Sequence, residues 1–136
     1  MHHLHDLNFV AIVVCAVIVW MLGALWYSPV LFAKPWVAIV GRQMGEKPKG
    51  VYVGMIGSLI GDLFLCFVLA HIIRWAGAEG WMGGAHIGLL MWAGFNAAVM
   101  FPQSIYEGRP LKYFLINTGY WLVSLVIVGA VLSVWR

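Results

Sequence analysis

Asp62 is the residue of this chain whose type and position most clearly suggest chemistry. It is the only carboxylate in an apolar stretch over about 51–75. An ionised group in apolar surroundings is costly, so such an acid usually binds a proton, a cation or a hydrogen-bond donor. Asn96, in an apolar stretch over about 84–102, and Asn117, further along the chain, carry amides that could meet it. We treat these three side chains as one candidate polar site.

Two interpretations of Asp62 remain open at this stage. In the first, the carboxylate handles a proton or a cation, as in small transporters. In the second, it holds helices together by hydrogen bonds to Asn96, Asn117 or a tyrosine hydroxyl. At about 1.5 Å per residue, Asp62 lies roughly 16 Å and Asn96 roughly 18 Å inside their stretches, so the two are expected at a similar depth.

A second group of polar residues lies in short connections. Glu107 and Arg109 share the segment Glu107-Gly108-Arg109-Pro110, and Lys34 lies in an earlier connection. A pair between Glu107 and Arg109, or between Glu107 and Lys34, would clamp the two connections together. Contact of these charges with a lipid headgroup or ligand is the alternative.

Histidines are the main candidate ligands for a metal or haem, and Asp6 and Glu79 are expected at the same surface. His71 and His86 fall near one expected surface, together with three in the leader: His2, His3 and His5. They could hold zinc or copper, or ligate a haem. However, no HxxxH or CxxCH spacing occurs, so we expect no cofactor.

The chain has no pattern typical of an enzyme or of a nucleic-acid-binding protein. It contains no glycine-rich phosphate loop, no HExxH and no GxSxG. Its net charge of +3 comes without a basic run. We therefore expect neither catalysis nor binding of nucleic acid.

The elements that position these residues follow from composition. Of the 136 residues, 63% are hydrophobic and only 10% are charged. A soluble domain is about half apolar and about a quarter charged. A chain this short could not hide such an excess in one core, which excludes an ordinary soluble domain, and a disordered chain would be far more polar.

Four stretches are long and apolar enough to cross a bilayer, which takes roughly 20 residues. Because they do not alternate apolar and polar residues, they predict helices rather than barrel strands. The fold class expected is an all-α, integral membrane four-helix bundle forming a single domain, residues 1–136. The expected spans are about 8–32, 51–75, 84–102 and 111–135.

Basic residues in short loops predict the orientation of the spans. Six lie in the two connections of one side, and Arg74 and Arg136 lie on the other. The positive-inside rule then places both termini outside a cytoplasmic (inner) membrane. The segment 34–40, too short to span, predicts a short helix at the headgroup level. The six basic residues are Lys34, Arg42, Lys47, Lys49, Arg109 and Lys112.

Small residues recur at helical spacing and predict close packing of helices in lipid. Three patterns stand out: Gly57-x-x-x-Gly61, Gly84-x-x-x-Gly88 and Gly129-x-x-x-Ser133. Since four spans make a thin bundle, some of these faces are expected to serve a homo-oligomer.

Several stretches resemble the small prokaryotic membrane proteins of domain of unknown function 1761. They are Trp26-Tyr27-Ser28-Pro29, Phe32-Ala33-Lys34-Pro35-Trp36, Glu107-Gly108-Arg109-Pro110-Leu111-Lys112 and Asn117-Thr118-Gly119-Tyr120-Trp121. The resemblance implies a compact four-span protein and brings no catalytic residues. Ala33 stands where a glycine is expected.

The residues thus lead to three functional hypotheses. The first is a small oligomeric transporter or channel that uses Asp62 for a proton or cation. The second is a non-catalytic accessory subunit of a larger membrane complex. The third is a binder of metal or haem at the outer face.

Overall fold

A computed structural model describes residues 7–41 and 50–135, and within these ranges the chain is helical without strands. Four helical stretches are long and apolar enough to cross a membrane, which identifies a multi-pass membrane protein. The helices are α1 (Phe9–Trp26), α2 (Ala33–Val40), α3 (Val51–Ala76), the continuous run of α4 (Gly80–Trp92), π-helix η2 (Ala93–Ala97) and α5 (Ala98–Tyr106), and α6 (Leu111–Val134). The short helix α2 matches the one predicted after the first span.

The first span is shorter than the sequence predicts. Helix α1 ends at Trp26 rather than near Phe32. The helix ends here because Pro29 has no amide hydrogen to donate to the Leu25 carbonyl and its ring would crowd that oxygen. The Ser28 hydroxyl donates to the Leu25 carbonyl instead, at 2.6 Å. The chain then turns, with the Phe32 amide donating to the Trp26 carbonyl at 3.0 Å, and enters α2. The aromatic and proline residues after Trp26 therefore form a connection.

The third span is longer than predicted, since it runs from Gly80 to Tyr106. It passes through Pro102, which lies inside α5. The π-helical segment η2 precedes α5 and contains Asn96. Irregular turns of this kind occur where a proline or a functional site disturbs the α-helical hydrogen bonds.

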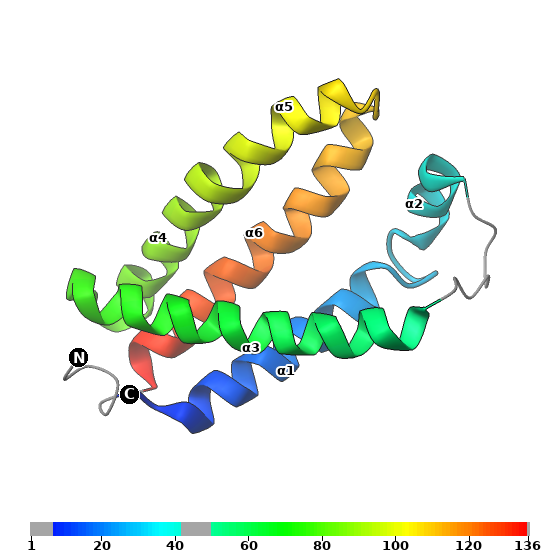
Figure 1. Ribbon diagram of the computed structural model, residues 1–136. Helices are drawn as coiled ribbons and strands as arrows, with labels where there is room; N and C mark the ends of the chain where they lie inside the picture. The colour runs from blue at the N-terminus through cyan, green and yellow to red at the C-terminus, as the bar shows by residue number, and fades with distance from the viewer. Residues whose placement is uncertain (1–6, 42–49, 136) are drawn as a thin grey trace.

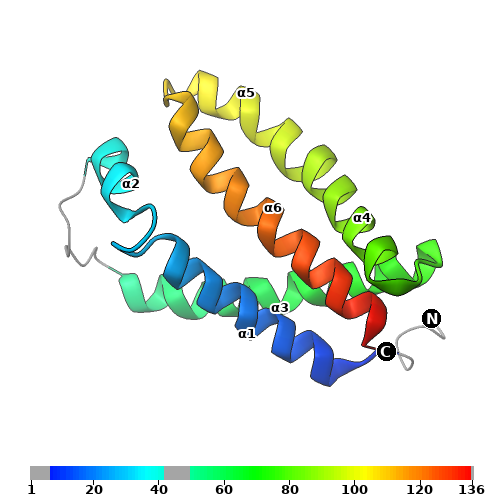
Figure 2. The same ribbon diagram turned by 180° about the vertical axis from the view of Figure 1, so that it is seen from behind.

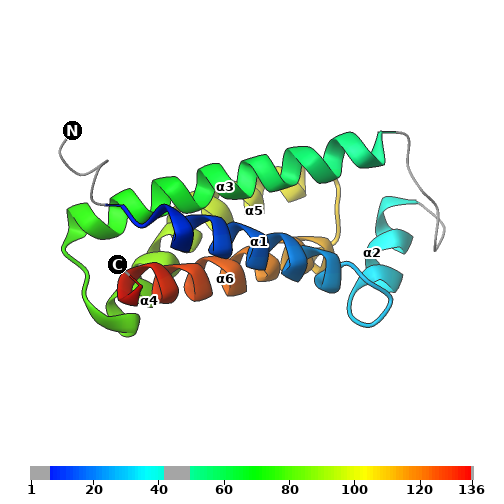
Figure 3. The same ribbon diagram turned by 90° about the horizontal axis from the view of Figure 1, so that it is seen from below.

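The helices form two antiparallel pairs, α1 with α3 and α4–α5 with α6 (Figures 1 and 3). The second pair is in the closest contact. A Cβ atom added at Gly84 would overlap sterically with the Gly129 carbonyl oxygen, and one at Gly88 would overlap with the Leu125 carbonyl oxygen. The small residues predicted to pack in α4 and α6 therefore do so, and they bring the two backbones together.

The hydrophobic core lies where the two pairs meet. Helices α1, α3 and α6 bury small and β-branched side chains there, while many large apolar side chains elsewhere remain exposed, as on a lipid-facing surface. The core includes Ala11, Cys15, Ala16 and Val19 of α1, Cys66, Leu69 and Ile73 of α3, and Val128 and Leu132 of α6. Toward its N-terminus, α3 diverges from α5 and α6 (Figure 1).

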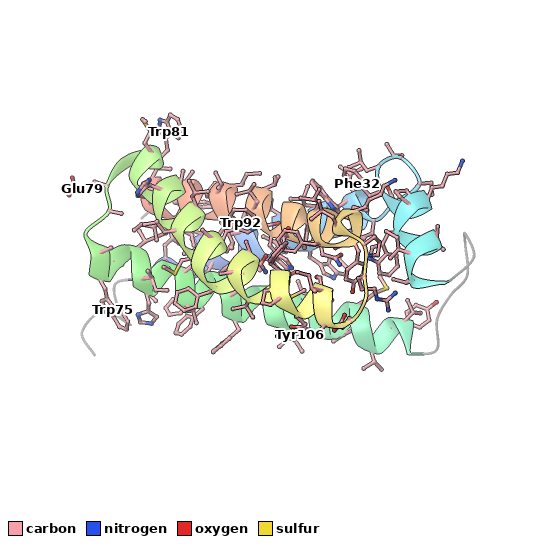
Figure 4. The ribbon with its side chains drawn as sticks, turned by 90° about the horizontal axis from the view of Figure 1, so that it is seen from above. Phe32, Trp75, Glu79, Trp81, Trp92 and Tyr106 are labelled. Carbon is pink, nitrogen blue, oxygen red and sulfur yellow. The ribbon has the colours of Figure 1, made fainter. Side chains whose placement is uncertain are left out.

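The two ends of the bundle differ in composition. One end, here called the α2 end, carries α2 and the turn between α5 and α6 (Figures 1 and 2). The other, the α3–α4 end, holds the turn between those helices and the C-terminal end of α6. Exposed Trp75 and Trp81 lie there with Glu79 (Figure 4), as expected of interfacial anchors.

Candidate functional site

Asp62 lies near the middle of α3 with only 4% of its surface exposed. It lines a groove of about 900 Å³ between α1, α3 and α6, here called the Asp62 groove. Among the described residues, none donates a hydrogen bond to the Asp62 carboxylate or forms an ion pair with it. The groove lining is Trp20, Gly23, Ala24, Tyr27, Gly50, Val51, Gly54, Met55, Ser58, Gly61, Asp62, Tyr120 and Trp121.

Small residues of α3 leave the space that forms this groove. A Cβ atom added at Gly54, Gly57 or Gly61 would meet nothing within 4 Å. Gly54, Ser58 and Gly61 line the groove. The pattern Gly57-x-x-x-Gly61 is therefore not a packing face within this chain, unlike the glycines of α4, because α3 diverges from the other pair here.

Aromatic residues form the opposite wall, and the polar atoms of three of them are already used within the protein. The rings of Tyr27 and Tyr120 are 5.9 Å apart between centroids, and those of Tyr120 and Trp121 are 4.7 Å apart. These rings can therefore offer the groove mainly their π surfaces. The bonds are Trp20 Nε1 to the Met55 carbonyl (3.1 Å), Tyr27 Oη to Asn117 Oδ1 (2.6 Å) and Tyr120 Oη to the Val19 carbonyl (2.7 Å).

The structure does not bring Asp62 and Asn96 together. Asn96 lines a second cavity of about 640 Å³ between α3, the third span and α6, here called the Asn96 cavity. Its Oδ1 atom is buried and accepts no hydrogen bond from the described residues. The two residues line different spaces, and Trp121 lines both. Helix rotation, which residue counting leaves undetermined, separates them.

Asn117 serves a structural contact. It accepts the hydrogen bond of Tyr27, a residue 90 positions earlier in the chain, and so joins α6 to the end of α1. Trp26 adds a second bond in the same region, from its indole nitrogen to the Ile116 carbonyl at 2.9 Å. This is the interhelical role considered for Asp62, but a different residue performs it.

At the α2 end, Arg109 alone of the predicted clamp residues joins the two connections. Its guanidinium donates to the Ile39 carbonyl of α2 at 3.0 Å and lies 5.2 Å from the Tyr113 ring centroid. Glu107 instead accepts from Gln103 Nε2 at 3.2 Å. Within the described residues, neither Arg109 nor Lys34 pairs with Glu107. The free carbonyls at the C-terminal end of a helix attract a cation, which explains why Arg109 contacts the end of α2 rather than Glu107.

The two histidines that the structure describes, His71 and His86, do not form part of a common metal site. His71 lies on α3 with its ring 4.8 Å from that of Phe67 and 5.3 Å from that of Trp75, between centroids. His86 lies exposed on α4. In residues 7–41 and 50–135, no three His, Cys, Asp or Glu side chains are placed to hold a metal ion. His2, His3 and His5 lie outside the described residues, as do Arg42, Lys47 and Lys49.

Sequence reasoning missed Tyr120 and Trp121 as part of the site. Their position, about ten residues inside the fourth span, was the available signal, because anchoring aromatic residues belong near the ends of spans. Tyr120 is buried, and both line the Asp62 groove.

Comparison with known proteins identifies the family. No curated protein and no solved structure matches the chain. The sequence pattern of one family, described as "Protein of unknown function (DUF1761)", matches residues 10–133, which covers all four long helices except the first residue of α1 and the last of α6. The match agrees with the resemblance drawn from the Trp-Tyr-Ser-Pro and Lys-Pro-Trp stretches. The chain therefore belongs to the protein family of unknown function DUF1761.

Proposed function

We propose that this protein is a small membrane transport protein in which Asp62 takes up and releases a proton or a monovalent cation. The observation that supports the proposal is a buried carboxylate without a partner among the described residues, at the inner end of a groove. A carboxylate at this depth in a bilayer must be neutralised. Among the residues that the structure describes, the groove lining includes no Lys, Arg or His, so in this proposal the neutralising charge comes from a bound proton or cation.

The groove also provides a route from one end of the bundle. Its lining begins at Gly50 and Val51, at the α2 end of α3, and reaches Asp62 in the middle of that helix. Trp121 stands between this groove and the Asn96 cavity, since it lines both. In our proposal, Asp62 binds its proton or cation from the α2 end and releases it toward the other side when Trp121 moves.

Flux measurements in proteoliposomes test this role. We expect Asp62→Asn to abolish proton flux, followed with an entrapped pH-sensitive dye, because the amide cannot accept the proton. Glu107→Gln is the matched control, since it removes one negative charge from an exposed turn outside the groove. Equal proton flux in wild type and Asp62→Asn, with both proteins folded by circular dichroism, would refute the proton role, and equal sodium and potassium flux in the same liposomes would refute the cation role.

A second candidate, an accessory subunit of a membrane complex, is favoured by the open face of α3. Gly57 and Gly61 have no neighbour where a Cβ atom would stand, and small faces of this kind pack against helices of another chain. A second copy of the protein would be the simplest partner. Gly57→Leu should then disrupt an oligomer or co-purified complex in mild detergent, whereas an unchanged monomer would count against this candidate.

We propose that the α2 end faces the cytoplasm, with both termini outside. Lys34, Arg109 and Lys112 belong to this end, whereas Arg74 lies at the other. The positive-inside rule supports this orientation in a cytoplasmic membrane. A cysteine introduced at Glu107 should be protected from an impermeant maleimide in intact cells, and one at Glu79 should react.

A further inference from the structure

We infer that the Asp62 groove binds a lipophilic organic monocation, with its charge beside Asp62 and its apolar groups against the aromatic wall. The inference rests on the proposed function, because it takes Asp62 as the binding carboxylate, and it adds the chemical class of the substrate. It combines the charge of the groove, the nature of its walls and its size.

Charge selects a cation. In the described part of the chain, Asp62 is the only lining residue that carries a formal charge, and no Lys, Arg or His lies among the thirteen. An anion would meet an unfavourable potential there, as would the phosphate of a lipid headgroup. A cation would supply the counter-charge that a buried carboxylate requires.

The wall favours an organic cation. Tyr27, Tyr120 and Trp121 form a continuous set of rings, and Trp20 adds a fourth aromatic residue to the lining. The hydrogen-bonding groups of Trp20, Tyr27 and Tyr120 are bound to protein oxygens, which leaves the π surfaces of the partly exposed Trp20 and Tyr27 for a ligand, while the buried Tyr120 supports the neighbouring rings. Aromatic faces attract organic cations, and substituted ammonium groups are recognised in this way.

The volume of the Asp62 groove and its few oxygen ligands fit a simple metal ion poorly. A volume of about 900 Å³ is far more than an inorganic ion needs and falls in the range of sites for drug-sized ligands, roughly 300–1,000 Å³. Calcium takes about six to eight oxygen ligands. The described part of the chain offers Asp62 and the Ser58 hydroxyl here, and no cluster of three metal-binding side chains.

The entrance suits a ligand dissolved in the membrane. Gly54, Met55 and Gly61 line the groove and are exposed on α3. Their neighbours Val53, Ile56 and Ile60 are among the exposed apolar residues of the molecule, as expected beside lipid. A lipophilic cation can therefore enter the groove from the bilayer along its open side, as well as from the α2 end, without crossing the core.

Binding of tetraphenylphosphonium to the protein in lipid nanodiscs tests the inference, with tetraphenylborate as an anion of the same shape. We expect saturable binding of the phosphonium only. Asp62→Asn should weaken it about tenfold or more, and Trp121→Leu about threefold or more, through loss of the counter-charge and of a ring face. Glu107→Gln and Trp81→Leu, which change the same residue types outside the groove, should bind as wild type does.

A third variant tests the place of binding independently of Asp62. Gly61→Val adds atoms where a Cβ would meet nothing within 4 Å, so it narrows the groove without a clash at that atom. We expect it to weaken phosphonium binding about tenfold or more while the protein unfolds at the same detergent composition as wild type or higher.

The inference would be overturned by equal binding of the anion and the cation, by unchanged binding in Asp62→Asn and Gly61→Val, or by a stable dimer that buries the groove and binds no phosphonium. Its failure is distinguishable from failure of the proposed function. If Asp62→Asn loses proton flux and the wild type binds no phosphonium, the inference is wrong and the proposed function still holds. Unchanged proton flux in Asp62→Asn would refute the role of Asp62 in proton transport. Specific phosphonium binding would in that case still identify the groove as a binding site for a lipophilic cation.

Discussion

A methyl group added at Gly88 should force apart the two most closely packed helices of this protein. The methyl carbon would lie well inside the contact distance of the Leu125 carbonyl oxygen of α6, a backbone atom that cannot move aside as the end of a flexible side chain can. Ordinary contact between a carbon and a carbonyl oxygen is about 3.3 Å or more, so α4 and α6 must separate by about 1 Å. The space that opens cannot be refilled by the buried glycines around it.

The expected free-energy change has two parts of opposite sign. Overpacking of a close interface costs typically about 1–3 kcal/mol. Replacement of glycine by alanine inside a helix raises the free energy of unfolding by about 1 kcal/mol, because alanine has the higher helix propensity. For Gly88→Ala we therefore expect a net loss of up to about 2 kcal/mol in the free energy of unfolding. Gly57→Ala is the matched control, because its added methyl meets nothing and only the favourable part remains.

The assay is unfolding of each variant in mixed micelles by increasing fractions of sodium dodecyl sulfate, followed by far-ultraviolet circular dichroism. Gly88→Ala should unfold at a lower fraction than wild type, and Gly57→Ala at the same or a higher one. If both variants were stabilised alike, the close approach of α4 and α6 would be wrong, and with it the distinction between packed and open glycines.

Three further predictions concern the contacts around the site. Arg109→Gln should loosen α2, because the hydrogen bond to Ile39 is lost, and proteolysis after residue 40 should accelerate while the unfolding free energy falls by about 0.5–1.5 kcal/mol. Tyr27→Phe should lower the free energy of unfolding by about 0.6 kcal/mol, which is typical of an interhelical hydrogen bond in a membrane protein. In a double-mutant cycle with Asn117→Ala, the two losses of unfolding free energy should be less than additive, because both variants remove the same bond. Cys66, which is a buried free thiol, should resist a maleimide in the folded protein and react on unfolding; rapid labelling before unfolding would contradict its burial.

The elements of this fold were predictable from the sequence because hydropathy is a local property. Uninterrupted apolar runs predicted the four long helices, and Lys34 and Pro35 indicated the short helix between the first two. The bounds were less predictable. The first span ends early because Ser28 and Pro29 turn the chain, and the third continues through Pro102, which sequence patterns treat as an end.

The contacts of the site were not predictable, because they depend on how each helix is rotated about its own axis. Residue counting placed Asp62 and Asn96 at a similar depth, but the structure assigns them to different cavities. The hydrogen bond that a polar pair was expected to make is found instead between Tyr27 and Asn117.

The sequence by itself determined that four apolar helices cross a membrane and that one acid must lie within it, since solvent preference depends only on the residues of each segment. The tertiary structure alone decided which small faces pack. Gly57 and Gly88 occupy similar patterns, yet only Gly88 touches another backbone. The reason is that packing depends on the angle between helices: α3 diverges where α4 and α6 stay close, and the space left beside Asp62 becomes the groove.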